Sequence, residues 1–397
     1  MPVDYQQIFE RVRAIGAGMG AKRKDLEQRQ AQARDLLTNY AAELDFLRSK
    51  VEAAKAVDSS VRCALPVSEA LTSAFPPPAS LPEATLIAAD GSQINPDRHA
   101  PLLYCVVNAG AIIMKLSSGQ APAIRTQTEL FYGDELQEHR LTSEGAVSLR
   151  RDLNERIFVE KLSQGLEGFV INLTDGTIEI WGAKDIEDPG AYERSVQQYL
   201  TVLSRLQSRG IPTAGYVDKP SADLVLRLLE IAKALPEDME NIRDYHPLRG
   251  VTDLWLFGYK NKDFQLLKPG ERSAVFQLQS GSEKFYKGML SLHFFYLNVS
   301  DSGKYPQIAR VELPRWVAED EGILNSLHAV LIQQCRVMGS RPYPYLLHRA
   351  HETAVVNHDE KAQIEQLLQQ ELWKNNGDAG DPSNKSSAKA LPGRTRR

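Results

Sequence analysis

The chain has 397 residues, of which 42% are hydrophobic and 25% charged, and its formal net charge is −4. This composition is typical of a soluble globular protein with a sizeable core, and the length allows two or three domains. The acidic balance excludes a generally basic nucleic-acid surface, so action on a polyanion would require a local basic channel, bound metal or a partner.

Cysteine usage and the apolar runs indicate the compartment. Cys63, Cys105 and Cys335 are widely scattered and offer neither a disulfide framework nor a zinc spacing. Residues 1–25 lack the apolar stretch of a signal peptide, and the longest apolar run, 102–116, is too short to span a membrane. We therefore expect a cytoplasmic protein with no membrane association.

The N-terminal part is predicted to be helical from about Tyr5 to Lys55. Apolar residues there follow a 3-4-3-4-3 spacing, which is typical of a coiled coil: Leu37, Tyr40, Leu44, Leu47, Val51 and Ala54. This stripe could form a dimer contact or pack on its own domain. The glycine-rich segment 16–22 follows a helix and lacks the Gly-Lys-Ser/Thr ending of a phosphate loop, so it predicts a helix break. We find no other nucleotide loop, which argues against an ATPase.

A proline-rich linker, 75–82, leads into a short apolar run, 86–89, that reads as a buried strand and is followed directly by Asp90. A carboxylate at the end of a buried strand is costly unless it is paired, and a bound cation is a common partner. Asp90-Gly91 could instead form a hairpin turn. However, residues 93–100 are polar and include a proline, so no returning strand follows at once.

The same pattern returns at 169–174, an apolar strand followed by Asp175-Gly176-Thr177. A hairpin is a stronger alternative here, because Ile178, Ile180 and Trp181 could form the returning strand. Two strands that each end in an aspartate would nevertheless place two carboxylates at one edge of a sheet. That arrangement suits phosphodiester chemistry with Mg²⁺ or Mn²⁺.

The rest of the chain alternates between strand and helix patterns, which predicts an α/β sheet. We expect strands at 102–107, 111–116, 126–131, 213–217, 290–299 and 308–312. We expect helices at 141–166, 192–209, 222–235, 323–338 and, largely, 349–373.

Four segments in this order resemble the NurA nuclease family: Ile87-Ala88-Ala89-Asp90-Gly91-Ser92-Gln93, Asp175-Gly176-Thr177, the run from Ala309 to Trp316, and the run from Arg341 to Glu352. The resemblance covers roughly residues 86–372. It implies an RNase H-like mixed sheet flanked by helices, which would form a nuclease domain over residues 76–372. An N-terminal helical or coiled-coil segment, 1–75, and a disordered basic tail, 373–397, would flank that domain.

The family's functional residues are expected at the matching positions. The resemblance implies catalytic roles for five residues: Asp90, Glu155, Asp175, Tyr343 and His351. All of these except Tyr343 would bind metal, which is expected to be Mn²⁺, with Mg²⁺ possible and two ions in all. Glu160 is the rival to Glu155 as the ligand from the helix. The run His348 to Glu352 reads H-x-x-H-E, which does not match a zinc-protease motif.

The implied function is a Mn²⁺-dependent DNA nuclease of the 5′–3′ exonuclease and single-strand endonuclease type. It would process DNA ends in repair, as a homodimer, together with a hexameric HerA-type translocase. Basic residues such as Arg150, Arg151 and Lys219 are expected near the site. One alternative is a non-catalytic NurA-fold partner of a HerA-like ATPase. Another RNase H-like enzyme, such as a resolvase, would share the carboxylates but would not explain the C-terminal motif.

Overall fold

The computed structural model describes residues 3–98, 100, 102–182, 189–260, 265–301 and 305–375. The chain forms two compact units, each built from two segments. The first unit comprises Met1–Pro78 and Val217–Glu319, and the second comprises Ala79–Tyr216 and Asp320–Arg397. The domain boundaries at residues 75 and 372 stay a prediction, and most of the predicted tail lies outside the described residues.

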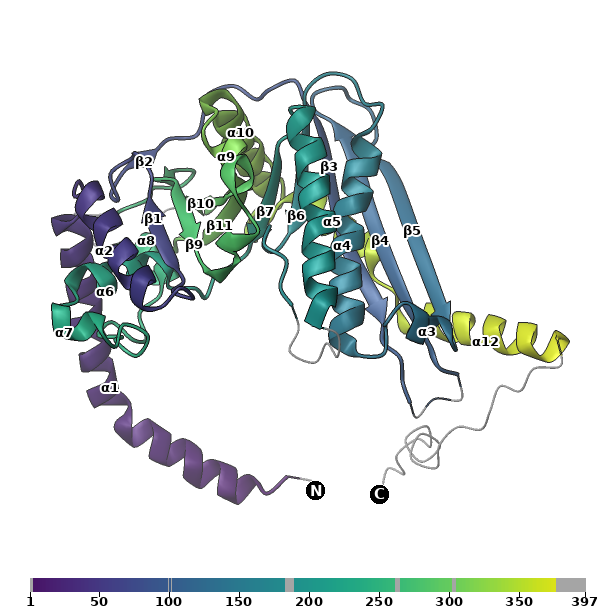
Figure 1. The fold of residues 1–397 in the computed structure, drawn as a ribbon, viewed down its shortest axis with the longest axis horizontal. Coiled ribbons are helices and arrows are strands. Elements are labelled where there is room, and N and C mark those ends of the chain that lie inside the picture. The colour runs from purple at the N-terminus through teal and green to yellow at the C-terminus, as the bar shows by residue number, and fades with distance from the viewer. Residues whose placement is uncertain are drawn as a thin grey trace. The chain divides into compact units, whose positions relative to one another are not determined.

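The first unit combines helices with an antiparallel sheet (Figure 1). Its helices are α1 (Tyr5–Asn39), α2 (Leu44–Val57), α6 (Leu224–Lys233), α7 (Pro236–Met239), α8 (Asp253–Gly258) and α9 (Arg315–Ala318), with short 3₁₀ turns η1 (Gly281–Lys284) and η2 (Gly288–Leu290). Its strands are β1 (Cys63–Pro66), β2 (Ala74–Phe75), β8 (Arg272–Ser273), β9 (Phe276–Gln279), β10 (Leu292–Asn298) and β11 (Ile308–Pro314). The strands β1, β9, β10 and β11 pair in that order, and β8 pairs with both β2 and β10.

Two predictions for the N-terminal segment need correction. The helix break at 16–22 is wrong, because α1 runs through it without interruption. Glycine inside a helix costs only about 1 kcal/mol, which a long helix tolerates. The chain breaks instead between Asn39 and Leu44. The apolar stripe there packs within its own unit, since Leu37, Leu47 and Val51 are fully or almost fully buried and α2 packs against α6 and β1.

The second unit contains a five-stranded mixed sheet. Its strands are β3 (Thr85–Ile94), β4 (Tyr104–Lys115), β5 (Ala123–Tyr132), β6 (Val170–Asp175) and β7 (Thr213–Val217). They lie in the order β7-β6-β3-β4-β5, with β3, β4 and β5 antiparallel and β3, β6 and β7 parallel. An antiparallel meander extended by parallel strands is the arrangement of an RNase H-like core. The predicted fold class, a mixed sheet flanked by helices, is confirmed.

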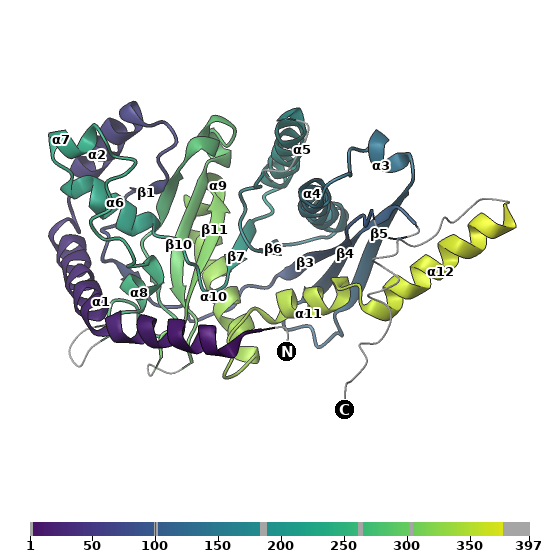
Figure 2. The same cartoon turned by 90° about the horizontal axis from the view of Figure 1, so that it is seen from below.

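Helices cover both faces of this sheet, as Figure 2 shows, with α4 and α5 on one side and α11 on the other. The helices of the unit are α3 (Glu135–Glu138), α4 (Glu144–Ser163), α5 (Pro189–Ser208), α10 (Glu321–Val337), α11 (Tyr345–Ala354) and α12 (His358–Lys374). The single helix expected at 349–373 is therefore two helices. Asn357 caps the second one and forms a reciprocal capping box with Glu360, which starts a new helix at that point.

Strand β3 differs from its prediction in a way that matters for the site. It continues through Asp90 and Gly91 to Ile94, and it pairs with β4 along this whole length. A hairpin turn at Asp90-Gly91 is thereby excluded. The two strands expected at 102–107 and 111–116 are one strand, β4. After β6, residues 176–182 form no strand, so the second hairpin alternative is also wrong.

Within the part of the chain that the structure describes, no helix is both long enough and apolar enough to cross a membrane. The three cysteine side chains are all buried, and no disulfide joins them.

Candidate functional site

The two aspartates of the repeated Asp-Gly pattern are brought together by strand pairing. The parallel ladder between β3 and β6 ends at the pair Ala89 and Thr174. Asp90 and Asp175 come one residue after this pair. They lie side by side on the same face of the sheet, because side chains alternate in step along neighbouring parallel strands. Each carboxylate accepts a hydrogen bond from the next backbone N–H, at 2.8 Å in Asp90 and 3.0 Å in Asp175.

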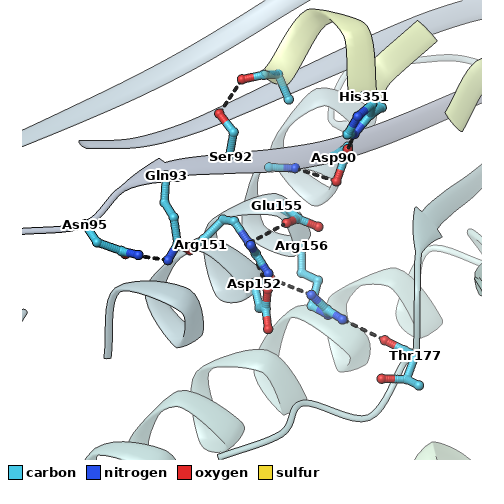
Figure 3. A network of polar contacts seen from close by, with 12 residues as sticks. Asp90, Ser92, Gln93, Asn95, Arg151, Asp152, Glu155, Arg156, Thr177 and His351 are labelled. Carbon is cyan, nitrogen blue, oxygen red and sulfur yellow. Dashed lines mark hydrogen bonds and ion pairs between the residues drawn. The ribbon is translucent and has the colours of Figure 1, made fainter. Parts of the chain in front are cut away.

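His351 of α11 reaches this edge from one face of the sheet. Its Nδ1 lies 2.6 Å from Asp90 Oδ2, and its side chain is 62% exposed against 13% for Asp90. Ser92 fixes the end of the same helix, because its hydroxyl donates to the carbonyl of Ala354 and accepts from the N–H of Val356. Asp90 and Ser92, two residues apart on one face of β3, thus contact the last turn of α11 and the residues just after it (Figure 3).

Glu155 approaches from the opposite face, on α4. It comes so close to β3 that a Cβ at Gly91 would lie 2.5 Å from Glu155 Oε1 and 2.7 Å from Arg151 Cγ. Only glycine leaves room for this carboxylate next to Asp90. The Asp-Gly-Ser sequence is therefore explained residue by residue: Asp90 faces α11, Gly91 admits α4, and Ser92 holds the end of α11.

The electrostatics of the site are dominated by crowded carboxylates. Glu155 is only 4% exposed. Its pKa is raised to about 8, chiefly by burial; the neighbouring Asp152 and Asp90 contribute to this rise, and Arg156 and Arg151 oppose it. Burial also raises the pKa of Asp175, and Asp90 adds to this rise. A positive ion placed among these groups would relieve both the repulsion and the cost of burial.

Tyr343 supports the second aspartate. Its hydroxyl forms a side-chain hydrogen bond with Asp175, which lowers the pKa of that carboxyl. The Tyr343 ring meets the ring of Tyr216 edge to face, with 5.5 Å between centroids. Tyr343 therefore acts on Asp175 directly and is held in place by packing against β7.

These residues surround one pocket with a volume of about 410 Å³. It is lined by Asp90, Gly91, Arg151, Asp152, Glu155, Arg156, Asp175, Gly176, Thr177, Glu179, Trp181 and His351. The structure thus brings together four of the five predicted site residues in the lining, with Tyr343 bonded to one of them. Sequence reasoning missed Asp152, Glu179 and Trp181.

The expected basic surroundings differ from the prediction in detail. Arg151 lines the pocket but is engaged by Asp152 at 2.7 Å and by Glu155 at 3.5 Å. Arg150 pairs with Glu129 at 2.9 Å. Lys219 belongs to the first unit, so its place near the site stays a prediction. Hence the guanidinium of Arg151 is already engaged in ion pairs within the pocket.

Glu160, the rival to Glu155, is buried but does not line the pocket. Its Oε1 accepts a hydrogen bond from Gln164 at 2.9 Å, and its Oε2 lies 4.0 Å from Arg205. The geometry therefore favours Glu155 as the carboxylate from the helix.

Carboxylate oxygens from three elements, joined by one imidazole, are a donor set that fits Mg²⁺ or Mn²⁺. Among the described residues, no three acidic, histidine or cysteine side chains already stand in coordination geometry. The hydrogen bond from His351 occupies one oxygen of Asp90. Ligation of a cation would thus require these side chains to change their conformations.

The fold and the pocket define a class: an α/β protein with an RNase H-like sheet and a crowded acidic pocket at the edge between β3 and β6. The NurA domain model matches residues 84–356. The chain therefore belongs to the NurA family.

Several solved structures are similar over most of the chain. The NurA nuclease from Sulfolobus solfataricus matches with 15% identity and a TM-score of 0.43, over 83% of this chain and 92% of that one. Human ENDOV matches with 11% identity and a TM-score of 0.31, over 68% and 82%. Endonuclease V from Ciona intestinalis, solved in complex with DNA containing an inosine, matches with 12% identity and a TM-score of 0.29, over 80% and 96%. No curated protein sequence matches the chain.

Proposed function

We propose that this protein is a metal-dependent DNA nuclease that hydrolyses phosphodiester bonds. The observation that carries this proposal is the convergence of Asp90, Glu155 and Asp175 from β3, α4 and β6 on one pocket. The similar structures from Sulfolobus and Ciona are a nuclease and an endonuclease in complex with DNA, which agrees with this function.

Asp90, Glu155, Asp175 and His351 would hold the cations, which we propose to be Mn²⁺ or Mg²⁺ and two in number. When bound, such ions neutralise charge on the phosphoryl group and on the leaving oxygen. The chain's own residues prepare the site for them. Tyr343 orients Asp175 through its hydrogen bond, and His351 orients Asp90 through its own.

Acidic side chains outnumber basic ones in the pocket. Arg151 and Arg156 line the pocket beside five carboxylates, so the site without cations is acidic and repels a phosphate. DNA binding at this pocket should therefore depend on divalent ions. This dependence separates the proposed site from a general basic DNA surface.

Incubation of the purified protein with end-labelled DNA, with Mn²⁺, with Mg²⁺ and with EDTA, tests the proposal. Cleavage that appears with a divalent ion and disappears with EDTA is expected. Labels at the 5′ or 3′ end would report polarity, which we propose to be 5′–3′, with endonuclease activity on single strands. If no ion supports cleavage and calorimetry detects no Mn²⁺ binding, the alternative of a non-catalytic NurA-fold partner of a HerA-like ATPase is the better one.

We further propose that the protein is a homodimer. The stripe between Leu37 and Ala54 is used within the chain, but the beginning of α1 carries another apolar face that is exposed. Its residues recur at helical spacing: Tyr5, Ile8, Phe9, Val12, Ile15 and Met19. Apolar residues at seven-residue steps, such as Tyr5, Val12 and Met19, suit pairing with the same helix of a second copy.

Light scattering on the full chain tests the dimer. We expect about twice the monomer mass of 44.3 kDa at micromolar concentration, and a shift to the monomer mass when Phe9 and Val12 are both changed to Glu. A monomer in the unchanged protein would contradict the proposal. Action with a HerA-type translocase at DNA ends during repair is the family expectation, which co-purification and ATPase stimulation would test.

A further inference from the structure

One side chain in the pocket does not fit metal or phosphate chemistry. Trp181 lines the same pocket as the carboxylates, and 53% of its surface is exposed. Tryptophan is usually mostly buried, because its large apolar surface is costly to leave in water. A half-exposed indole in the lining of an otherwise polar pocket therefore suits a flat, apolar ligand group.

The indole is held in place by a short, well-anchored segment. Its Nε1 donates to Thr177 Oγ1 at 3.2 Å, and that hydroxyl donates in turn to the carbonyl of Glu179 at 2.8 Å. The carbonyl of Thr177 accepts a hydrogen bond from Arg156 at 2.7 Å. Thr177 thus links Trp181 to α4, the helix that carries Glu155.

Close packing and one backbone hydrogen bond also fix the segment 176–181. Ile178 and Ile180 are almost completely buried on either side of Glu179. The N–H of Gly176 donates to the carbonyl of Tyr216 at 2.8 Å. A Cβ at Gly215 would lie 2.5 Å from the carbonyl oxygen of Gly176, so only glycine at 215 allows this close approach. The indole is therefore pre-positioned, which reduces the entropy lost when a ligand stacks on it.

We infer that Trp181 is a stacking surface for a nucleobase, and that the pocket takes a nucleotide of a single strand or of a frayed end. This inference rests on the proposed nuclease function. A nucleobase is the flat apolar part of a ligand whose phosphates suit the adjacent metal-binding carboxylates. Base stacking on aromatic side chains is a common, sequence-tolerant way to hold single strands.

The same geometry disfavours an intact duplex. Each base in a duplex is already stacked on its neighbours and paired across the helix. Stacking on Trp181 would require a base to leave that stack, at a cost of a few kcal/mol. An unpaired base has no such cost, so Trp181 would select single-stranded substrate.

Binding measurements separate this role from cleavage. The probes are a fluorescent oligothymidylate and a blunt hairpin duplex, with Ca²⁺ as the divalent cation because it has the same preference for oxygen ligands. Trp181→Ala should weaken oligothymidylate binding by about tenfold and change duplex binding little. Trp181→Phe should keep affinity within about threefold of the unchanged protein. Trp373→Ala, which removes an indole that is 80% exposed on α12, is the matched control and should bind normally.

Tryptophan fluorescence gives a second readout. Oligothymidylate should quench the emission of the unchanged protein, and Trp181→Phe should lose this quenching while it still binds. Two results would overturn the inference: equal affinity of Trp181→Ala and the unchanged protein for oligothymidylate, or no binding of oligothymidylate by either. Equal affinity would leave Trp181 as a contact for a protein partner. Stacking without cleavage in any ion would leave this inference standing and defeat the nuclease proposal, whereas cleavage unchanged by Trp181→Ala would do the reverse.

Discussion

Two buried carboxyl groups, one in each unit, show how differently this protein uses the same chemistry. Asp253, at the start of α8, is completely buried and accepts three hydrogen bonds, from Val225 N at 2.8 Å, Leu226 N at 2.9 Å and the Tyr296 hydroxyl at 2.5 Å. Burial raises its pKa to about 6, and the three hydrogen bonds oppose the rise. Asp253 therefore serves the structure, by capping the beginning of α6.

Glu155 is almost equally buried, yet its neighbours include two further carboxylates, and its pKa rises to about 8. Burial alone thus does not separate an acid that caps a helix from one that lines the candidate site. What separates them is whether the surrounding groups are hydrogen-bond donors or other acids. Hydrogen-bond donors stabilise a buried carboxylate without any ligand. A cluster of acids repels itself, and a bound cation would relieve that repulsion.

The largest effect should come from the acidic pocket. Asp90→Asn or Asp175→Asn should lower cleavage by about a thousandfold or more, because each change removes a ligand charge without changing side-chain size. The melting temperature should stay the same or rise, since one source of repulsion is gone. Cleavage rates and thermal melts of both variants check this. Full cleavage by either variant would contradict the ligand assignment.

The next largest effect should come from Asp253 and should be a loss of stability with no loss of cleavage. Asp253→Ala leaves two backbone N–H groups and one hydroxyl without their acceptor, which should lower the free energy of unfolding by about 3 kcal/mol. Cleavage by the folded fraction should be unchanged. Urea unfolding, followed by an activity assay at low temperature, separates the two quantities. A stable but inactive variant would erase the contrast between the two acids.

Two glutamates on α4 should differ in their effect on cleavage. Glu155→Gln should lower cleavage about a hundredfold more than Glu160→Gln, because only Glu155 lines the pocket. Glu160→Gln is a matched control, as both side chains are buried on α4. The reverse ranking would move the ligand to Glu160 and leave the nuclease proposal intact.

The pH dependence of stability gives a smaller, signed effect. Asp253 keeps its proton up to a pH of about 6 in the folded chain, against an ordinary value of 3.8. Between these values the folded state binds more protons, so the stability that this group contributes is lost as pH rises. The unchanged protein should lose about 1.4 kcal/mol per pH unit relative to Asp253→Asn in this window, and nothing further above it. Unfolding curves of both proteins at several pH values measure this difference, and a flat difference would contradict the assignment.

The smallest effect is expected from the C-terminal tail. Deletion of residues 374–397, which removes six basic and two acidic side chains, should weaken DNA binding a few-fold at low salt. The effect should vanish at high salt, and the rate of cleavage at saturating DNA should not change. A loss of cleavage at saturation would instead assign the tail to the catalytic unit.

The sequence supports the prediction of those parts of the site that local patterns encode. Asp90 and Asp175 each follow an apolar strand, and the parallel pairing of the strands brings them together. The helix pattern alone does not separate Glu155 from Glu160, because both lie on α4. The close approach at Gly91 shows that Glu155 is the one next to β3.

The remaining residues depend on tertiary contacts that no local pattern reports. Trp181 and Glu179 lie in an irregular segment, whose path depends on Gly215 and on the carbonyl of Tyr216. The division into two units is equally non-local, because each unit is assembled from two separated segments. The predicted end of β3 is also wrong, because a polar Asp-Gly-Ser inside the strand resembles the end of a strand.

Two glycines in this sheet have a consequence for how the protein tolerates mutation. Gly91 on β3 faces α4, and Gly110, which pairs with Asp90, faces α11, where a Cβ would lie 2.6 Å from Ala354 N. The two helices that carry Glu155 and His351 are thus spaced by bare backbone on either side of one sheet. In a saturation-mutagenesis screen for activity, positions 91 and 110 should score as intolerant as the acids themselves, although neither residue has a side chain to take part in chemistry.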